Sequence, residues 1–159
     1  MDWKMNFQQS YKSPAGDLTI RATDSAITEI KFGFSEFEHA NDLTQNAVHQ
    51  LQQYFQLKRH SFDLPLKPEG TEFQKAVWNQ LLKIPISQKS SYGKLASLVG
   101  KPKAARAIGG AVGANPIAIV IPCHRVVATN GKITGYTGGE GIKTKQLLLE
   151  MESSVSETA

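Results

Sequence analysis

The stretch that constrains the fold of this chain most is a run of five apolar residues, 117–121, enclosed by Pro116 and Pro122. It reads Ile-Ala-Ile-Val-Ile, and a β-branched run of this length between prolines is typical of a buried strand. The only cysteine of the 159 residues, Cys123, follows directly, and His124 comes next. We therefore expect a buried strand that ends at Pro122 and presents a thiol beyond its end.

The single cysteine limits the chemistry that is available to the chain. It excludes an internal disulfide and a zinc site built on several cysteines. We expect neither a metal nor a cofactor. We find no signal-peptide pattern and no apolar run that is long enough to span a membrane. We therefore interpret the chain as a globular protein of ordinary composition that is monomeric and lies in the reducing cytoplasm.

Charge is distributed unevenly along the chain. The formal net charge is +4, and residues 75–145 contain eleven Lys and Arg but only one acid, Glu140. A positive field that belongs to the half with the cysteine favours a nucleic-acid partner.

The N-terminal half has the patterns of a small sheet with one helix. Strands are expected at 6–11, 17–22 and 26–32, and again at 59–64. Asn41 can cap a helix whose apolar face includes Leu51.

The C-terminal half has mostly helical patterns. Thr71 and Gln74 form a capping box for one helix, Ser90 or Ser91 can cap a shorter one, and 103–112 can be helical. Asn130-Gly131 marks a tight turn, residues 135–139 a glycine loop, and 143–151 a last helix.

The linker 65–70 contains two prolines, and we place the domain boundary there. The prediction is an α+β (α/β) chain with an N-terminal β-rich domain at 1–66, a mostly helical domain at 67–153 and a disordered tail at 154–159. The second domain would carry a helix-turn-helix and the loop with the cysteine.

The helix at 103–112 has an unusually bare surface, with alanines, glycines and one long cation, Arg106. Helices that read the major groove carry Arg, Asn and Gln for the base edges. A bare helix suits a narrow groove, with Arg106 as its single probe. The alternative is that the small residues pack against another helix.

Cys123 is a nucleophile only as a thiolate, so it needs a lowered pKa or a nearby base. His124 is adjacent, but neighbouring side chains on a strand point to opposite faces, so a water or a turn must intervene. Glu150 on the last helix could orient the imidazole. The alternative is that Cys123 is a small buried hydrophobe.

The segment Pro122-Cys123-His124-Arg125-Val126 resembles the active-site signature of the O6-alkylguanine-DNA alkyltransferases, also called methylated-DNA–protein-cysteine methyltransferases. The resemblance continues, in the order and spacing of that family, over residues 71–151. It is carried by Ser91-Tyr92-Gly93, Ala104-Ala105-Arg106-Ala107, Gly109-Gly110-Ala111, Asn115-Pro116, Gly135-Tyr136, Gly138-Gly139 and Glu150.

The resemblance implies a DNA repair protein that acts once. Cys123 would take the alkyl group from O6 of guanine and keep it as a thioether, and whether it also takes one from O4 of thymine stays open. His124, a water and Glu150 would relay the thiol proton, and Tyr92 would protonate the departing base. The N-terminal domain would be ribonuclease-H-like.

The same resemblance implies a double-stranded DNA partner that is bound in the minor groove with the damaged base flipped out. Arg106 would fill the gap in the base stack, and Asn115 would tie the helix-turn-helix to the active-site loop. The expected DNA contacts are Tyr92, Lys103, Ala105, Arg106, Arg125 and Thr129. The expected base pocket is formed by Asn115, Val126, Tyr136 and Thr137.

Two other functions fit part of the pattern. A DNA-binding helix-turn-helix module would use Arg106 and the lysines but give Cys123 no role. A cysteine hydrolase would turn over many times and need no DNA. Glu140 departs from the apolar residue that is common at this place in the family, which bears on the shape of the pocket rim.

Overall fold

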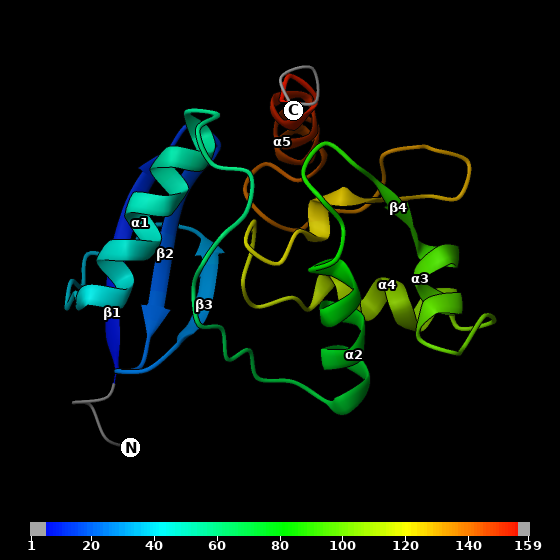
Figure 1. Cartoon of the computed structure of the whole chain (residues 1–159), viewed down its shortest axis with the longest axis horizontal. Helices are drawn as coiled ribbons and strands as arrows, with labels where there is room; N and C mark the ends of the chain where they lie inside the picture. Colours follow the sequence, from blue (N-terminus) through cyan, green and yellow to red (C-terminus); the bar gives the residue numbers. More distant parts are fainter. Residues whose placement is uncertain (1–5, 156–159) are drawn as a thin grey trace.

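The computed structural model describes residues 6–155, and its first half is a three-stranded antiparallel sheet with one helix. The strands β1 (Phe7–Ser13), β2 (Gly16–Ala22) and β3 (Ile27–Phe32) lie in that order. Helix α1 (Asp42–Phe55) covers one face of the sheet (Figure 1). These elements confirm the predicted α+β character of the chain.

Helix α1 begins where its sequence indicates. The side chain of Asn41 accepts a hydrogen bond from the backbone N–H of Thr44, whose hydroxyl in turn accepts one from the N–H of Asn41. This reciprocal pair satisfies donors that the first helical turn leaves free. Ala47, Leu51 and Tyr54 are then buried on one face.

The strand predicted at 59–64 is wrong. Asp63 instead exchanges two hydrogen bonds with the side chain of Gln50, through its N–H at 2.9 Å and its C=O at 3.0 Å. The side chain of Gln50 on α1 therefore occupies the N–H and C=O groups of Asp63 that a strand would use for pairing. The segment 59–64 packs against α1 without regular secondary structure.

The second half is mostly helical and contains a very short parallel strand pair, β4 (Ser90–Ser91) with β5 (Val126–Val127). Thr71 and Gln74 form the predicted capping box, and Ser91 caps the next helix. Leu98 of this helix is 52% exposed. The elements are α2 (Glu72–Leu81), β4 (Ser90–Ser91), α3 (Tyr92–Leu98), α4 (Ala105–Gly113), η2 (Cys123–Arg125), β5 (Val126–Val127) and α5 (Ile142–Ser153).

The apolar run 117–121 is not the strand that its composition predicts. It forms consecutive turns, with Ile119 in the left-handed region at φ 71°, and makes only one isolated bridge, from Ile117 to Ile30. Apolarity does bury the run, but a buried strand needs neighbours along its length, and here turns supply most of the hydrogen bonds. Cys123 therefore opens a 3₁₀ turn.

The free edge of β3 joins the two halves. Ile27 exchanges backbone hydrogen bonds of 2.8 Å with Pro65 and Lys67, and Ile30 does so with Pro116 and Ala118 at 2.9 and 2.8 Å. These bonds satisfy groups that an open sheet edge would expose. Part of the predicted linker and the start of the apolar run thus lie along the sheet.

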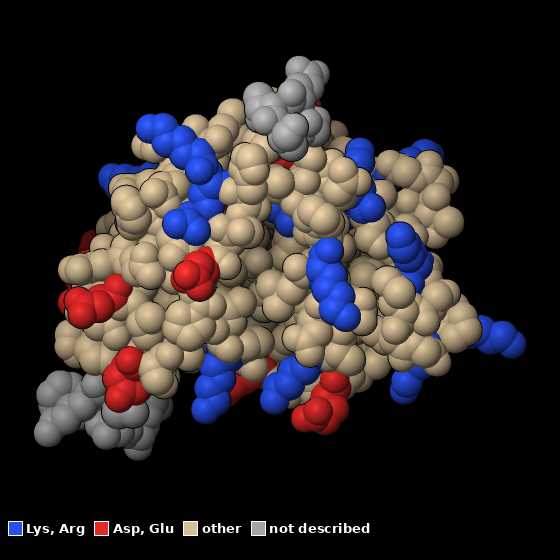
Figure 2. All heavy atoms as spheres, in the orientation of Figure 1, with Lys and Arg blue, Asp and Glu red and all other residues tan. Residues whose placement is uncertain are grey.

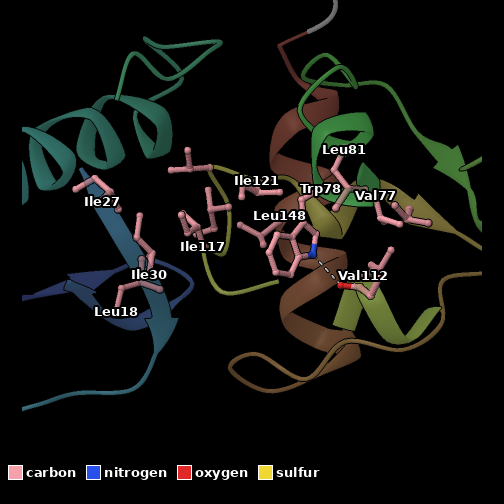
Figure 3. Packing of buried hydrophobic residues seen from close by; sticks show 14 of the residues in the cluster. Leu18, Ile27, Ile30, Val77, Trp78, Leu81, Val112, Ile117, Ile121 and Leu148 are labelled. Carbon is pink, nitrogen blue, oxygen red and sulfur yellow. Dashed lines mark hydrogen bonds between the residues drawn. The ribbon is translucent and has the colours of Figure 1, made fainter. Parts of the chain in front are cut away.

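One cluster of buried residues runs through both halves. Figure 3 shows Ile27 and Ile30 of the sheet facing Ile117 and Ile121, with Trp78 beyond them. The indole N–H of Trp78 donates to the carbonyl of Ala111 at 2.8 Å, which fixes α2 against α4. The turns that carry Cys123 are therefore held between the sheet and the helices.

The end of the described chain is ordered further than expected. Helix α5 continues to Ser153, and Val155 is 4% exposed, so the predicted disordered tail is wrong at 154 and 155. An apolar Val among polar residues docks against the protein. The rest of the predicted tail, 156–159, lies outside the described residues. Within 6–155 no helix has the length and apolarity needed to cross a membrane.

Candidate active site

A cavity of about 700 Å³ lies where the two halves meet, and Cys123 is part of its wall. The sheet half contributes the ends of β2 and β3, and the helical half contributes α4 and the loop 135–139. Most of the residues predicted for the active site and the base pocket line it: Tyr92, Asn115, Cys123, Tyr136 and Thr137. Val126 does not, because it is fully buried in β5.

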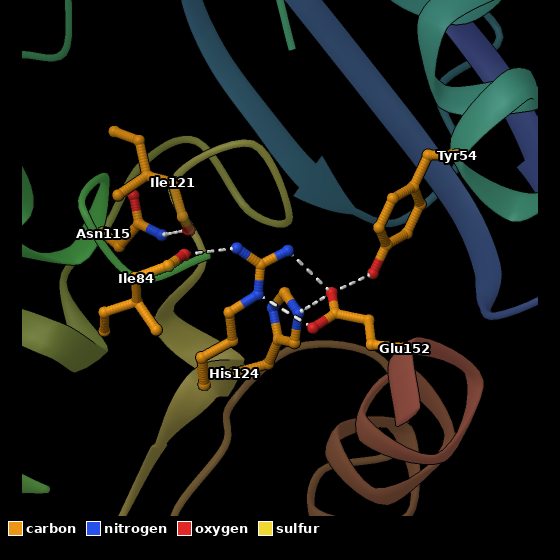
Figure 4. A network of polar contacts seen from close by, with 7 residues as sticks. Tyr54, Ile84, Asn115, Ile121, His124 and Glu152 are labelled. Atoms are coloured by element: carbon orange, nitrogen blue, oxygen red, sulfur yellow. Dashed lines mark hydrogen bonds and ion pairs between the residues drawn. The ribbon is translucent and has the colours of Figure 1, made fainter. Parts of the chain in front are cut away.

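Behind the cavity lies a buried network around Glu152 (Figure 4). Its Oε2 is 2.6 Å from Nε2 of His124, and both side chains are fully buried. The guanidinium of Arg125 donates to both carboxylate oxygens, at 2.8 and 3.0 Å. The hydroxyl of Tyr54 donates to Oε2 at 2.5 Å.

The prediction that Glu150 orients His124 is wrong, because Glu152 makes that contact. Both residues lie on α5, but two positions correspond to about 200° around a helix, so they face opposite sides. Glu150 is exposed, whereas Glu152 is turned into the protein. The sequence thus correctly predicted a carboxylate beside the histidine. Which glutamate provides it depends on the direction in which each side chain leaves the helix.

The prediction that Arg125 contacts DNA is also wrong. Its side chain is 8% exposed and points inward, where it also donates to the carbonyl of Ile84 at 2.7 Å. The 3₁₀ turn places Arg125 on the same side as His124, which an extended strand would not have done. Arg125 therefore balances the charge of Glu152.

The pKa values of the thiol and the imidazole fit a proton relay. Burial raises the pKa of Cys123, although hydrogen bonding by Asn115 and the charge of Lys145 act against it, so the resting group is a thiol. Burial lowers the pKa of His124 more than Glu152 raises it, so the imidazole is neutral near neutral pH. A partly buried thiol with a raised pKa needs a base, and a neutral imidazole can be one.

The tautomer of His124 follows from its partner. Burial opposes the charge of Glu152, but His124 and Arg125 outweigh it and lower the pKa of this carboxyl to about 2. An ionised carboxylate only accepts, so Nε2 carries the proton. Nδ1 then has the lone pair; it is buried and has no hydrogen-bond partner within residues 6–155.

Two further groups shape the cavity wall. Asn115 donates to the carbonyl of Ile121 at 2.8 Å and accepts from the N–H of Ile117 at 3.0 Å, so it fixes the turns before Cys123. Lys145 is fully buried and donates to the carbonyl of Thr134 at 2.7 Å, at the start of the glycine loop. From the sequence, Lys145 was one of eleven basic residues in the second half, and nothing in its local pattern indicates that it is buried.

The surface of α4 is as bare as its sequence indicates. A Cβ added at Gly109, Gly110 or Gly113 would meet nothing within 4 Å, so this face does not pack against another helix. Arg106 projects from it and is exposed, as are Ala105, Lys103 and Thr129. On the face shown in Figure 2, basic side chains lie over both halves, whereas acidic ones gather mainly over the sheet half at left.

Two family models match the chain, and together they cover most of it. Residues 6–68 match the ribonuclease-like domain of 6-O-methylguanine DNA methyltransferase, and residues 72–154 match its DNA binding domain. The inducible methylated-DNA–protein-cysteine methyltransferase of Bacillus subtilis is 49% identical over 98% of this chain and 87% of its own length.

Solved structures agree with these matches. The crystal structure of Mycobacterium tuberculosis O6-methylguanine methyltransferase is 41% identical and has a TM-score of 0.85 over 94% of each chain. The Mycobacterium tuberculosis OGT solved in complex with DNA is 42% identical over 93% of each chain, also at 0.85. The chain therefore belongs to the 6-O-methylguanine DNA methyltransferase family.

Proposed function

We propose that this protein repairs DNA directly, by moving the alkyl group from O6 of an alkylated guanine to Cys123 in a reaction that each molecule performs once. The observation that carries the proposal is the buried His124–Glu152 pair behind a cavity that contains the only cysteine. The imidazole of this pair supplies the base that a thiol with a raised pKa needs. Relatives named methylated-DNA–protein-cysteine methyltransferases support it.

The residues suggest the following steps. Nδ1 of His124 takes the proton of the thiol, directly or through one water, and Glu152 stabilises the imidazolium. Sγ of Cys123 then attacks the alkyl carbon, so that a C–S bond forms while the C–O6 bond breaks. The electron pair leaves with guanine, which takes up one proton, and the protein keeps a thioether.

Tyr92 is proposed as the donor of that proton. It lines the cavity with Cys123, and burial and the nearby thiolate raise its pKa, against hydrogen bonding with Thr134, so that its hydroxyl stays protonated. Guanine leaves poorly as an anion, so a positioned acid accelerates the step. The tyrosine recovers its proton from solvent.

The substrate must reach the cavity as a flipped base, because O6 inside a duplex is out of reach of a thiol. We assign α4 to the minor groove and Arg106 to the gap that the base leaves. Lys103 and the exposed basic residues would bind phosphates, which carry no sequence information and so permit repair anywhere. Reduced Cys123 and access to DNA favour the cytoplasm, and each event needs one monomer.

The test is the intact mass of the protein after incubation with a duplex that carries O6-methylguanine. We expect one added methyl group on the Cys123 peptide, a yield capped at one per protein molecule, and no transfer to Cys123→Ala. That variant should still bind the duplex.

Each rival function predicts another result. An unmodified protein that binds the duplex would indicate a DNA-binding module only. Product in excess of protein would indicate a hydrolase.

A further inference from the structure

We propose that a second cavity, in the helical half, is a binding site for a small organic anion, that is, an apolar body that carries one carboxylate, sulfonate or phosphate group. The cavity has a volume of about 650 Å³ and is formed by the end of α2, the loop 82–89, β4 and α3. We call it the α2–α3 pocket. Binding there does not depend on the proposed repair reaction.

Apolar side chains form a large part of the wall of this pocket. Leu95 is fully buried, whereas Leu98, one turn further along α3, is exposed. An apolar ligand body would cover Leu98 and remove it from water, which favours binding. Concave sites of about 300–1,000 Å³ with such walls are typical of small-molecule binding. The apolar lining residues are Ile84, Pro85, Ile86, Leu95, Leu98 and Val155.

Positive charge borders the same pocket. Lys83, Lys89 and Lys94 line it and are exposed, and no acid among residues 6–155 lines it. None of the ion pairs found between described residues involves these three lysines. Their fields therefore add up over the pocket and favour a ligand with negative charge. The apolar wall and the cations together suit a molecule with an apolar body and one anionic group.

The wall also contains a polar group without a partner. The hydroxyl of Ser90 is buried, and no hydrogen-bond partner for it is found within residues 6–155. Ser90 is held in place because β4 pairs with β5, where its partner is Val126. A buried hydroxyl that makes no hydrogen bond costs free energy. An anionic ligand group would supply the acceptor that this hydroxyl lacks.

The rim of the pocket includes a strained residue. Ser87 lines the pocket with φ 67°, in the left-handed region that residues with a side chain rarely adopt. The N–H of Gln88 donates to the carbonyl of Pro85 at 3.1 Å and closes the turn that contains Ser87. Strained backbone of this kind clusters at ligand-binding sites. The turn also positions Lys89, which follows it directly.

The α2–α3 pocket is separate from the active site. No described residue lines both this pocket and the cavity that contains Cys123, and α4 contributes no residue to it. The pocket can therefore be occupied while α4 lies on DNA and a base lies beside Cys123.

The experiment uses two fluorescent probes that share one aromatic body. 8-Anilinonaphthalene-1-sulfonate carries the anionic group, and N-phenyl-1-naphthylamine lacks it. In fluorescence titrations of the parent protein we expect the sulfonate to bind about tenfold more tightly than the amine, because its charge meets the lysines. Lys89→Gln should weaken binding of the sulfonate about threefold, as for one exposed ion pair, and leave binding of the amine unchanged.

The apolar wall is tested by Leu98→Gln, which keeps a good helix former in α3. Both probes should bind about tenfold more weakly to this variant, because the ligand loses an apolar contact. The matched control is Leu82→Gln. Leu82 is also exposed and follows α2, but it does not line the pocket. Its affinities should stay within about twofold of the parent.

Three results would overturn the proposal. The first is equal affinity of the parent protein for the two probes, or no binding of either. The second is a loss of binding in Phe34→Ala but not in Leu98→Gln, because Phe34 lines the active-site cavity instead. The third is displacement of the sulfonate by an unmodified duplex, which would assign the lysines to the DNA interface; we expect the duplex to leave its affinity unchanged.

Discussion

The hydroxyl of Tyr54 donates a 2.5 Å hydrogen bond to Oε2 of Glu152, 98 residues further along the chain. Tyr54 lies on α1 of the sheet half, and Glu152 lies at the end of α5. The same oxygen is in contact with His124 and Arg125. The sheet half therefore takes part in setting the basicity of the carboxylate behind the active-site histidine.

Replacing Tyr54 by Phe should shift the pH dependence of repair. One donor fewer on Oε2 leaves more negative charge to stabilise the imidazolium, so the pKa of His124 rises. The acid limb of the alkyl-transfer rate should then move to higher pH, in a series from about pH 5 to about pH 8. The free energy of unfolding should fall by about 1.5 kcal/mol, because the lost bond ended on a charged group.

Tyr11→Phe is the control for that shift. Tyr11 packs in the sheet half near Phe55, and burial raises its pKa. Within residues 6–155 no hydrogen bond joins its side chain to His124 or Glu152. If the acid limb of the transfer rate lies at the same pH in Tyr54→Phe, Tyr11→Phe and the parent protein, Tyr54 affects stability only and the predicted shift is wrong.

The two glutamates of α5 should respond very differently to the same change. Glu152→Gln removes the charge that orients His124 and pairs with buried Arg125, so alkyl transfer should fall severely and unfolding should cost roughly 3 kcal/mol less. Glu150→Gln alters an exposed side chain and should match the parent in both respects. Adduct formation on Cys123 and urea unfolding measure the two quantities, and a greater loss of transfer in Glu150→Gln contradicts the assignment.

These glutamates also show what the sequence can predict. The motif around Cys123 indicates the chemistry, and the capping residues Asn41 and Thr71 locate helix starts because caps are local interactions. Which of two acids faces inward depends on how α5 packs, and packing involves residues far away such as Tyr54. Local pattern cannot contain that information.

The apolar run 117–121 illustrates a second limit. Its hydrophobicity correctly indicates burial, but burial is compatible with a strand or with turns. The run forms turns because of two contacts outside its own pattern. Ile117 bridges to Ile30 of the sheet, and the side chain of Asn115 hydrogen-bonds to Ile117 and Ile121. The DNA contact that the resemblance implied for Arg125 is wrong because the 3₁₀ turn directs this side chain to Glu152.

Acid should destabilise the protein in two stages. The folded-state pKa of His124 is lowered by burial, so the unfolded chain binds protons more readily, and stability falls as the pH drops below about 6.5. The folded-state pKa of Glu152 is about 2, so a second loss follows between about pH 4.5 and that value. Urea unfolding at a series of pH values checks this, and Glu152→Gln should remove the second stage. A free energy that is constant from neutral pH down to about pH 4 contradicts the first.

Arg106→Ala should impair repair of duplexes but not the reactivity of the thiol. Flipping a base costs a few kcal/mol, and a cation in the gap offsets part of this cost. The rate constant on a duplex should fall at least about tenfold, while alkylation by the free base O6-benzylguanine stays unchanged. Lys12→Ala, which removes an exposed cation from the sheet half, is the control. Equal losses on both substrates contradict the role assigned to Arg106.

Asn115→Ala should make Cys123 less reactive at neutral pH, because a smaller fraction of it is thiolate. Asn115 holds the carbonyl of Ile121 and the N–H of Ile117, and its hydrogen bonding lowers the pKa of the thiol against the effect of burial. Without it the thiol pKa should rise further, and alkyl transfer should slow about tenfold, the loss expected for a hydrogen bond to a charged group. The pH dependence of iodoacetamide alkylation measures the first effect, because Cys123 is the only cysteine in the chain. Asn130→Ala breaks a comparable bond, to the N–H of Lys132, in an exposed turn and should change neither quantity. A slower transfer with an unchanged thiol titration would mean that Asn115 acts through the shape of the turn alone.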